Sequence, residues 1–415
     1  MSVRDRPQAG EEWTFRPAPK ISELGHRTVP ARETLARARA QARRVPISRL
    51  ADLTPLDRLR LPVYSATTPL ARDLTIHTGK GLDAESAELS ALMEAVERVS
   101  AEQVERPTLR SSFRRMSDKV RSAIDPRAFD LPDDSRFSDD RPLTWIDGWD
   151  LVRKETVWVP LDLATSPPAE GVLRHVDTNG LAAGNTLLEA VVHGLCEVIE
   201  RDALGLLLFR SIFGDADDEP IEARRIDPAS LPEVCRDWRA RISANGLLLE
   251  TEALDSDTRI PVFRSVLIDD AYPSGRGTET RFFLGLGASP NATVAAIRSI
   301  TEAVQSRVGI VHGARDSFNS VSAPWRRSGP RFTLATDSRR ATPLADVPTF
   351  STIDLLEDLH FLLARLTEAG FDRVIAVNLS RREFGLPVVR VRVPGLTSFA
   401  VNRRRIGWRC LRYLL

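Results

Sequence analysis

The spacing of apolar residues along the chain predicts a mixture of helices and strands. Apolar residues recur with helical spacing around Leu92 and Leu195, and again over residues 292–310. Short stretches in which β-branched and aromatic residues alternate with polar ones predict strands. We expect strands at 61–70, 143–151, 155–163, 247–255, 260–270, 280–288, 373–380 and 386–396, and further helices at 32–45 and 353–369. This mixture indicates the α+β class.

Three segments do not follow either periodicity. Residues 1–25 are polar and interrupted by proline, so we expect a flexible N-terminal segment that is ordered only when it docks. Residues 26–415 are predicted to form one domain, and within it 314–350, rich in Ser, Pro and Arg, is expected to be a surface excursion. Gly79-Lys80-Gly81 is predicted to be a turn leading into the helix around Leu92.

Composition narrows the class of protein. Lys and Arg number 58 and Asp and Glu 57, so the chain carries no net field that would favour a nucleic-acid partner. The three cysteines are scattered and lack zinc-ligand spacing. The first residues lack the apolar run of a signal peptide, and no apolar stretch is long enough to span a membrane. We therefore expect a cytoplasmic protein without a membrane association.

An acidic phrase is repeated within the helical stretches. Glu94-Ala-Val-Glu97-Arg98 and Glu197-Val-Ile-Glu200-Arg201 are the first two copies, and an altered third copy begins at Glu302. The copies stand roughly 100 residues apart, and the first two match over their flanking glycines and alanines as well, which indicates a structural duplication.

The repeated acids are suited to holding a divalent cation. Residues three apart lie on one face of a helix, so Glu94 projects with Glu97, and Glu197 with Glu200. Their apolar neighbours place these faces near a core, where like charges would be costly unless a cation offset them. Mg²⁺ prefers oxygen ligands and commonly shares them with phosphates. We therefore expect Mg²⁺ and a triphosphate between the acidic helices.

Several other residues fit a nucleotide. Lys80 stands between two glycines at a helix entry, and Asn185 precedes Thr186, which we expect to cap the second acidic helix in a capping box with Glu189. Arg298 and Gln305 share one face of the third helix with Glu302. The chain has no P-loop, dinucleotide fingerprint or kinase motif, so a nucleotide would bind through the acidic helices.

Structural interpretations compete with these assignments. A single Glu-x-x-Glu-Arg phrase is typical of a solvated helix face, and only its repetition within apolar helices favours a site. Lys80 alone would be an ordinary solvated lysine in a turn. We expect His193 to be a packed imidazole rather than a ligand, and Cys196 to be a buried small residue rather than a nucleophile.

These motifs together resemble the YcaO family. Ser90-x-x-x-Glu94-Ala-x-Glu97-Arg98 is similar to its first signature, and Asn185-Thr186-x-x-Glu189-Ala followed by Glu197-x-x-Glu200-Arg201-Asp202 is similar to its second. The segment ending Glu302-Ala-x-Gln305-Ser306-Arg307 resembles the third. The likeness extends from about His26 to Pro394.

The resemblance implies an enzyme that uses ATP and Mg²⁺ to phosphorylate a peptide backbone amide, on a fold with duplicated helix and sheet units. It implies Mg²⁺ and phosphate contacts at the four acids of the repeat and a catalytic role for Glu200 and Arg201. Lys20 and Arg27 are further candidates to reach the nucleotide. The implied nucleotide contacts are Ser90, Asn185, Glu189, Arg201, Arg298 and Gln305, and the position of Lys80 at a helix entry adds it to this set.

The resemblance also suggests the type of reaction. The final residues, NRRRIGWRCLRYLL, differ from the Pro-x-Pro-x-Pro tail of many azoline-forming members. The layout is most similar to members that work with a TfuA-type partner, so we expect thioamide formation by a homodimer acting with such a partner on a peptide. Azoline formation and a non-catalytic, nucleotide-binding scaffold role are the alternatives.

Overall fold

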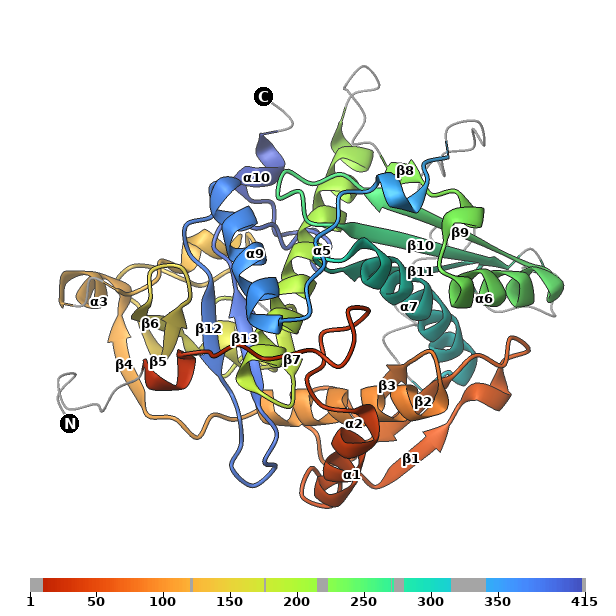
Figure 1. Cartoon of the computed structure of the whole chain (residues 1–415). Coiled ribbons are helices and arrows are strands. Elements are labelled where there is room, and N and C mark those ends of the chain that lie inside the picture. Colours follow the sequence, from red (N-terminus) through yellow and green to blue (C-terminus); the bar gives the residue numbers. More distant parts are fainter. Residues whose placement is uncertain are drawn as a thin grey trace.

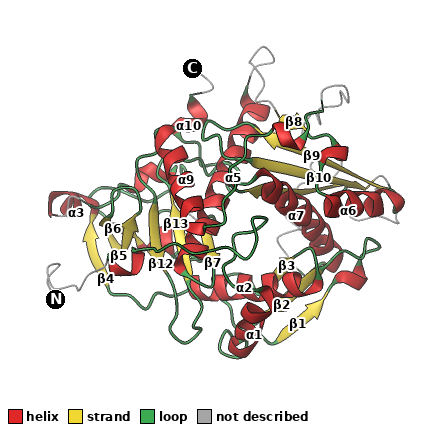
Figure 2. Ribbon diagram, in the orientation of Figure 1, coloured by secondary structure: helices red, strands yellow, loops and turns green. Residues whose placement is uncertain are grey.

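Three antiparallel sheets and the helices that follow them form the body of the protein (Figures 1 and 2). The computed structural model describes residues 10–119, 122–174, 177–214, 223–269, 271, 280–314 and 341–412. Most of the predicted surface excursion at 314–350 therefore lies outside the described residues. The mixture of helices and sheets confirms the α+β prediction.

The first two sheets are formed by strands close to one another in the sequence. The first has the order β1-β2-β3 and the second the order β11-β10-β9-β8. Their strands are β1 (Arg49–Asp52), β2 (Val63–Thr67), β3 (Ile76–Lys80), β8 (Ala223–Arg225), β9 (Leu247–Leu254), β10 (Val262–Asp269) and β11 (Phe282–Ala288). Strands β3 and β11 are thus outer strands among the described residues.

The third sheet joins distant parts of the chain. Its order is β4-β5-β12-β13-β7, and β6 pairs with β5. Its strands are β4 (Thr108–Ser112), β5 (Pro142–Asp150), β6 (Glu155–Pro160), β7 (Leu181–Ala183), β12 (Ile375–Asn378) and β13 (Val388–Arg392). Strand β7 is an outer strand here, so each sheet has one outer strand that leads directly into a long helix.

The long helices α2, α5 and α7 follow β3, β7 and β11, respectively. The helices are α1 (Ala31–Gln41), α2 (Ala84–Ala101), α3 (Phe113–Lys119), α4 (Leu161–Ala164), α5 (Leu187–Phe213), α6 (Glu233–Ala244), α7 (Ala292–His312), α9 (Leu355–Glu368) and α10 (Trp408–Leu411). In Figure 1 the three long helices converge on the middle of the molecule. A large apolar cluster lies around each of them, and each cluster includes residues of more than one sheet. Each sheet with its long helix, here called a unit, therefore shares its core with a neighbouring unit.

Glycines allow the long helices to approach their strands closely. A Cβ atom on Gly79 would lie 2.0 Å from the amide nitrogen of Ala91 in α2, and one on Gly285 would lie 2.0 Å from the carbonyl oxygen of Ser299 in α7. The prediction of a turn at residues 79–81 is therefore wrong for Gly79 and Lys80, which end strand β3. Gly79 serves close packing rather than chain reversal.

The eight predicted strand stretches each contain a strand, and the helices predicted at 32–45, 292–310 and 353–369 correspond to α1, α7 and α9. The short strands β1, β3, β4, β7 and β8 were not predicted. Residues 10–25, expected to be ordered only when docked, lie docked on the body: Trp13 is 7% exposed and Lys20 forms a buried 2.8 Å ion pair with Asp358. Residues 1–9 lie outside the described residues.

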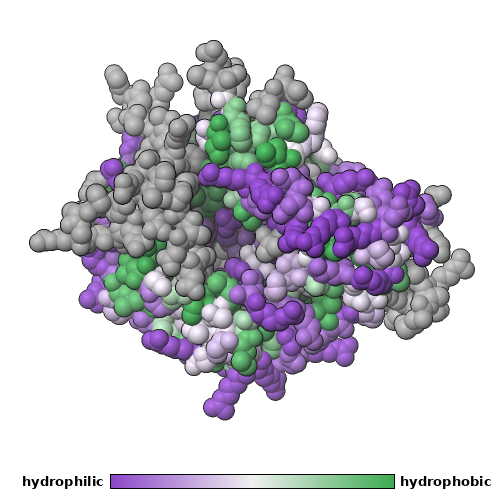
Figure 3. All heavy atoms as spheres, turned by 180° about the vertical axis from the view of Figure 1, so that it is seen from behind, coloured by the Kyte–Doolittle hydropathy of each residue, from purple (hydrophilic) through white to green (hydrophobic). Residues whose placement is uncertain are grey.

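The face of the molecule shown in Figure 3 carries both hydrophilic side chains and exposed apolar ones. Figure 3 shows apolar residues gathered at the upper edge of the molecule, the region where α5 and α10 end in Figure 1. Exposed apolar side chains of these two helices include Phe213 and Trp408, the latter 68% exposed. No helix within the described residues has the length and apolar character needed to cross a bilayer.

Candidate functional site

The acidic residues of the three long helices line one cavity of about 690 Å³. Glu94 and Glu97 of α2 project into it together, as do Glu197 and Glu200 of α5, while α7 contributes Glu302. The structure thus brings the four predicted metal ligands together from two helices that are far apart in the sequence.

The acids of α2 also fasten two outer strands to the cavity wall. The Thr78 amide of β3 donates to Oε2 of Glu94 at 3.0 Å, and the Ala183 amide of β7 donates to Oε1 of Glu97 at 2.8 Å. Each contact satisfies a main-chain donor at the outer edge of a sheet. The acids are therefore held in place by backbone contacts as well as by their helix.

The electrostatic environment disfavours full ionisation of these acids. Burial, together with the nearby Glu94 and Glu197, raises the pKa of Glu97 to about 8, although the Ala183 amide acts against this. Burial and Glu302 raise the pKa of Glu200 to about 7, and burial also raises the pKa of Glu197. A divalent cation between them would offset this repulsion and favour the ionised forms.

The donor set fits Mg²⁺. Oε2 of Glu200 is buried and has no hydrogen-bond partner, which leaves a carboxylate oxygen available for a cation. Within the described ranges, no three Asp, Glu, His or Cys side chains form a ready-made metal cage. An incomplete set of carboxylates is the arrangement expected where Mg²⁺ takes its remaining ligands from phosphates and water.

Basic residues lie among the acids and would suit the phosphates. Lys80 is ion-paired with Glu302, and Arg201 lies 4.0 Å from Glu197 and 3.9 Å from Glu200. Burial alone would raise the pKa of Glu302, but the positive charges of Lys80 and Arg201 lower it below its usual value. The basic side chains that line the cavity are Arg27, Lys80, Arg98, Arg201 and Arg298.

Most of the predicted nucleotide contacts also line the cavity. Ser90, Asn185, Arg298 and Gln305 do so, and Gln305 donates from Nε2 to the Thr78 carbonyl of β3. The Asn185 amide oxygen accepts from Thr34 at 2.9 Å. These residues form the walls around the acidic centre.

Glu189 lies behind this wall rather than in it. Its side chain is fully buried, and it does not line the cavity. The carboxylate accepts from the amides of Thr28 and Asn185 at 2.7 and 2.8 Å, and it does not return to Thr186, as a capping box would require. Against the effect of burial, the Thr28 hydroxyl and Arg27 lower its pKa. In this structure Glu189 positions Asn185 and Arg27.

Two further predictions are decided by burial. Arg27 lines the cavity with 46% of its side chain exposed, whereas Lys20 is paired elsewhere, as described above. Cys196 is fully buried, which raises the pKa of its thiol to about 12 and confirms that it is a core residue.

His193 is a site residue that the sequence interpretation placed in the core. It lines the cavity, and its Nδ1 lies 3.0 Å from a guanidinium nitrogen of Arg298. Because an arginine can only donate, Nδ1 must accept and the proton of the neutral ring resides on Nε2. Burial and Arg298 hold its pKa well below the usual range, consistent with that state. Its position one turn before Glu197 was the available sequence signal.

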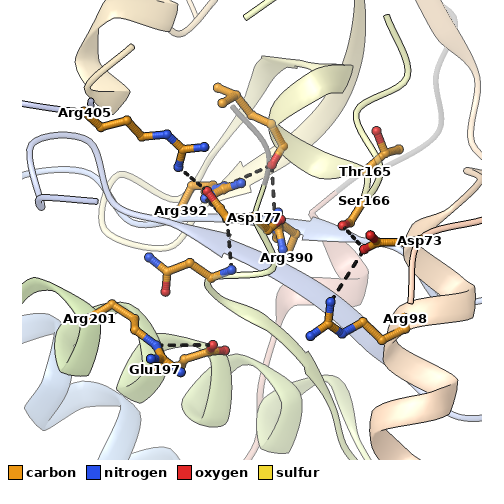
Figure 4. A network of polar contacts seen from close by, with 12 residues as sticks. Asp73, Arg98, Thr165, Ser166, Asp177, Glu197, Arg201, Arg390, Arg392 and Arg405 are labelled. Atoms are coloured by element: carbon orange, nitrogen blue, oxygen red, sulfur yellow. Dashed lines mark hydrogen bonds and ion pairs between the residues drawn. The ribbon is translucent and has the colours of Figure 1, made fainter. Parts of the chain in front are cut away.

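A buried arginine cluster behind the cavity was also missed. Figure 4 shows Arg390 and Arg392 of β13 and Arg405 from the C-terminal segment converging on Asp177. Arg390 and Arg405 are fully buried, and burial lowers the pKa of Arg390 to about 9. The sequence signal is an arginine at alternate positions of an apolar strand, Val-Val-Arg-Val-Arg.

A second network in Figure 4 supports the far end of the acidic phrase in α2. Arg98 lies 3.6 Å from Asp73, whose other contact is a 2.8 Å hydrogen bond from the Ser166 hydroxyl. Arg98 also lies 3.7 Å from Glu94. The arginine that ends the phrase therefore links an acid of the cavity to two loops.

Comparison with known proteins places the chain in a family. Residues 78–397 match the profile of the family described as YcaO cyclodehydratase, ATP- and Mg²⁺-binding. An uncharacterized protein of Methanothermobacter thermautotrophicus is 32% identical over 384 residues, covering 88% of this chain and 93% of the relative. An uncharacterized protein in the tfuA 3′ region of Rhizobium leguminosarum bv. trifolii is 32% identical over 392 residues, covering 91% and 90%.

Solved structures share the fold. The structure of YcaO from Methanopyrus kandleri bound with AMPPCP and Mg²⁺ has a TM-score of 0.73 and 26% identity, covering 95% of this chain and 98% of that one. A heterocyclase in complex with substrate and cofactor has a TM-score of 0.77 and 23% identity, covering 94% of this chain and 55% of that one. At that identity the second likeness concerns the fold alone.

Proposed function

The chain belongs to the YcaO family of ATP- and Mg²⁺-dependent peptide-modifying proteins, and from this membership we propose that it converts a peptide backbone amide to a thioamide. In the proposed reaction the amide oxygen is phosphorylated by ATP, and a sulfur nucleophile then replaces it with release of phosphate. The observation that carries the catalytic part of the proposal is the set of four carboxylates in one cavity, with a buried and unpartnered oxygen on Glu200.

The proposal assigns a role to each group of residues. Glu94, Glu97, Glu197 and Glu200 would hold Mg²⁺, which would neutralise phosphate charge during transfer. Lys80, Arg201 and Arg298 would contact the phosphates, with Glu200 and Arg201 nearest the reacting group. Ser90, Asn185 and Gln305 would contact the rest of the nucleotide, and Glu189 would position Asn185.

The choice of thioamide formation rests on a relative. That relative is named for its position in a tfuA 3′ region, and a TfuA-like partner for this chain is part of the proposal. We further propose a homodimer and a cytoplasmic location, where ATP and newly made peptides are both available. Azoline formation is the second candidate, because the matching family profile is described as a cyclodehydratase.

Calorimetry with ATP tests the site. Mg²⁺-dependent binding is expected for the wild-type chain, and Glu97→Gln or Glu200→Gln should weaken it by at least about tenfold because each removes a ligand. Glu88→Gln is the matched control, since Glu88 lies on the same helix, pairs with Arg39 and is outside the cavity. Binding that survives both cavity substitutions would refute the metal assignment.

Mass spectrometry distinguishes the reactions. A candidate peptide would be incubated with the chain, MgATP, sulfide and a TfuA-like protein. Exchange of one oxygen for sulfur supports thioamide formation, whereas loss of one water without sulfur supports azoline formation. ATP binding without any change in the peptides would favour the scaffold role.

A further inference from the structure

The outer edge of strand β11 faces the cavity. The Asp269 amide of β10 donates to the carbonyl of Arg281, the residue before β11, at 2.9 Å. The odd-numbered residues of β11 therefore form the main-chain hydrogen bonds with β10. In an antiparallel sheet the main-chain groups of alternate residues point to opposite edges. The amides and carbonyls of Phe282 and Leu284 therefore point away from β10.

Three successive residues confirm that this edge forms part of the cavity wall. Phe282, Phe283 and Leu284 all line the cavity, although side chains alternate between the two faces of a strand. The Phe283 side chain is 1% exposed and packs in the core with α7. A wall that includes all three residues must follow the edge of the strand.

This edge differs from the other two that reach the cavity. The outer edge of β3 is occupied by Glu94 and Gln305, and that of β7 by Glu97, as described above. In the part of the chain that the structure describes, the outer edge of β11 receives only hydroxyl groups. Ser306 donates to the Leu284 carbonyl at 2.7 Å, and Thr280 lies 3.3–3.4 Å from the main-chain atoms of Phe282.

The surroundings of this edge suit a peptide next to the reacting centre. Ser306 lies one helical turn after Glu302 on α7, so the edge begins close to the acidic centre. Apolar side chains of Leu89, Met93 and Ile310 line the same cavity, beside those of Phe282 and Leu284. The space thus combines main-chain hydrogen-bonding groups with apolar walls.

We propose that an extended segment of the substrate peptide pairs with the outer edge of β11 at Phe282 and Leu284. This inference rests on the proposed function, because an enzyme that acts on a backbone amide gains from holding the backbone itself. Strand addition of this kind recognises main-chain groups and leaves the side chains to separate pockets. Alternate amides of the bound peptide would point away from β11. One of these amides would lie next to the phosphates of ATP.

Photo-crosslinking in the full chain tests this pairing. Benzoylphenylalanine would replace Phe282 in one variant and Trp408, which is exposed on α10, in the control. Both would be irradiated with MgATP and a randomised mixture of short peptides. We expect at least about tenfold more peptide captured at position 282, and a similar loss of capture when alternate peptide nitrogens are methylated, since two hydrogen bonds are removed.

A protein variant provides a second test that does not depend on the crosslinker at Phe282. In Leu284→Pro the lost amide is one that faces the cavity rather than β10, and edge strands tolerate such a proline. Peptide capture from a benzoylphenylalanine at Ile310 should fall about tenfold, while the melting temperature reports that the chain is folded.

The opposite outcomes are distinct. Equal capture of methylated and unmethylated peptides, or capture at 282 no higher than at 408, would overturn the edge pairing. Labelling of residues 282–284 by 8-azido-ATP would also overturn it and assign this edge to the nucleotide base. Calorimetry with MgATP on the same protein distinguishes a failure of the edge pairing from a failure of the proposed function. A wild type that does not bind MgATP refutes the proposed function itself.

Discussion

At the residue scale, two properties of Glu97 and Glu200 lower the free energy of unfolding when no cation is bound. The two residues are surrounded by other acids, and burial raises their pKa values to about 8 and about 7. A carboxylate with a raised pKa binds a proton in the folded chain that it would lose in the unfolded chain at the same pH. The acidic centre should therefore destabilise the free protein at neutral pH.

The contribution of these two acids to the stability of the free protein should consequently fall as the pH rises from about 5 to about 8. In this range the two carboxyl groups bind more protons in the folded state than in the unfolded state, where glutamates titrate near pH 4.3, so their titration favours unfolding as the pH rises. Thermal melting without Mg²⁺ measures the effect. Glu97→Gln should lose less stability than the wild type as the pH rises over this range, whereas Glu88→Gln should follow the wild type. An identical pH dependence in the wild type and in Glu97→Gln would contradict the environment described here.

The buried pair of Arg264 and Glu252 allows a separate test of stability. The side chains are 1% and 2% exposed and lie on neighbouring strands, β10 and β9. Arg264→Leu should lower the free energy of unfolding by about 3–5 kcal/mol, because it removes a buried counter-charge and its hydrogen bonds from the Glu252 carboxylate. Chemical denaturation checks this value.

The double variant Arg264→Leu/Glu252→Leu is the control for that pair. It should recover much of the loss, since the buried negative charge of Glu252 is removed along with the positive charge of Arg264. A double variant as unstable as the single one would show that packing, rather than charge, sets the cost.

At the scale of elements, the important relation is the close packing of each long helix on the strand before it. Gly79 in β3 and Gly285 in β11 both lie where a Cβ atom would meet helix backbone. The acids of α2 in turn bond to the edges of β3 and β7. A small displacement of a helix would therefore move both the carboxylates and the strand edges.

Gly79→Ala should accordingly affect both stability and binding. The added methyl group would lie 2.0 Å from the Ala91 nitrogen and 2.3 Å from the Ala87 carbonyl oxygen, so α2 must shift. Overpacking of this kind lowers the free energy of unfolding by about 1–3 kcal/mol. We expect that loss in denaturation, together with weaker MgATP binding in calorimetry.

Gly25→Ala is the matched control for Gly79→Ala. A Cβ atom there would approach only the Arg27 nitrogen, at 4.0 Å, and the change should leave both measurements nearly unaltered. If Gly79→Ala behaved like Gly25→Ala, the close approach of α2 and β3 would not matter for the site.

The sequence predicted these elements with uneven success, for physical reasons. The acidic helices were predictable because their apolar spacing and their repeated phrase coincide, and the eight longer strands alternate over enough residues to be recognised. Strands β3 and β7 are short, and the glycines next to them favour turns in isolation. Only packing against α2 and α5 makes them strands, and a single sequence does not display such long-range contacts.

At the scale of the whole molecule, the cavity exists because three units that are distant in the sequence meet at their long helices, α2, α5 and α7. The four carboxylates could be inferred from the sequence, since like charges on apolar helices need an explanation. The sequence carries only weak signals for His193 and for the arginine cluster on Asp177, and none for the position of Glu189 behind the cavity wall, because each depends on contacts between distant parts of the chain. The edge of β11 is likewise visible only once strand order is known.

The C-terminal segment ties these units together. Arg409 donates to both carboxylate oxygens of Asp202 at 2.8 Å, and Asp202 is fully buried in α5 next to Arg201. Arg409→Met should lower the free energy of unfolding by about 3–5 kcal/mol, because Asp202 would lose its counter-charge. Chemical denaturation should show this loss.

Arg404→Met is the control for this segment. Arg404 pairs with Asp133 and Asp134 at the surface, so its loss should change stability by at most about 1 kcal/mol. Equal effects of the two substitutions would argue against a special role for the contact with α5.

The inward-facing outer strands have a consequence for the behaviour of the protein in solution. Unpaired strand edges on a surface invite association with other chains and aggregation. Here the outer edges of β3, β7 and β11 face the acidic cavity, where carboxylates accept hydrogen bonds from the first two and a hydroxyl group donates to the third. The arrangement that brings the carboxylates together therefore also keeps strand edges that could pair with other chains off the outer surface. Replacing the acids of the cavity should reduce the solubility of the protein as well as ligand binding.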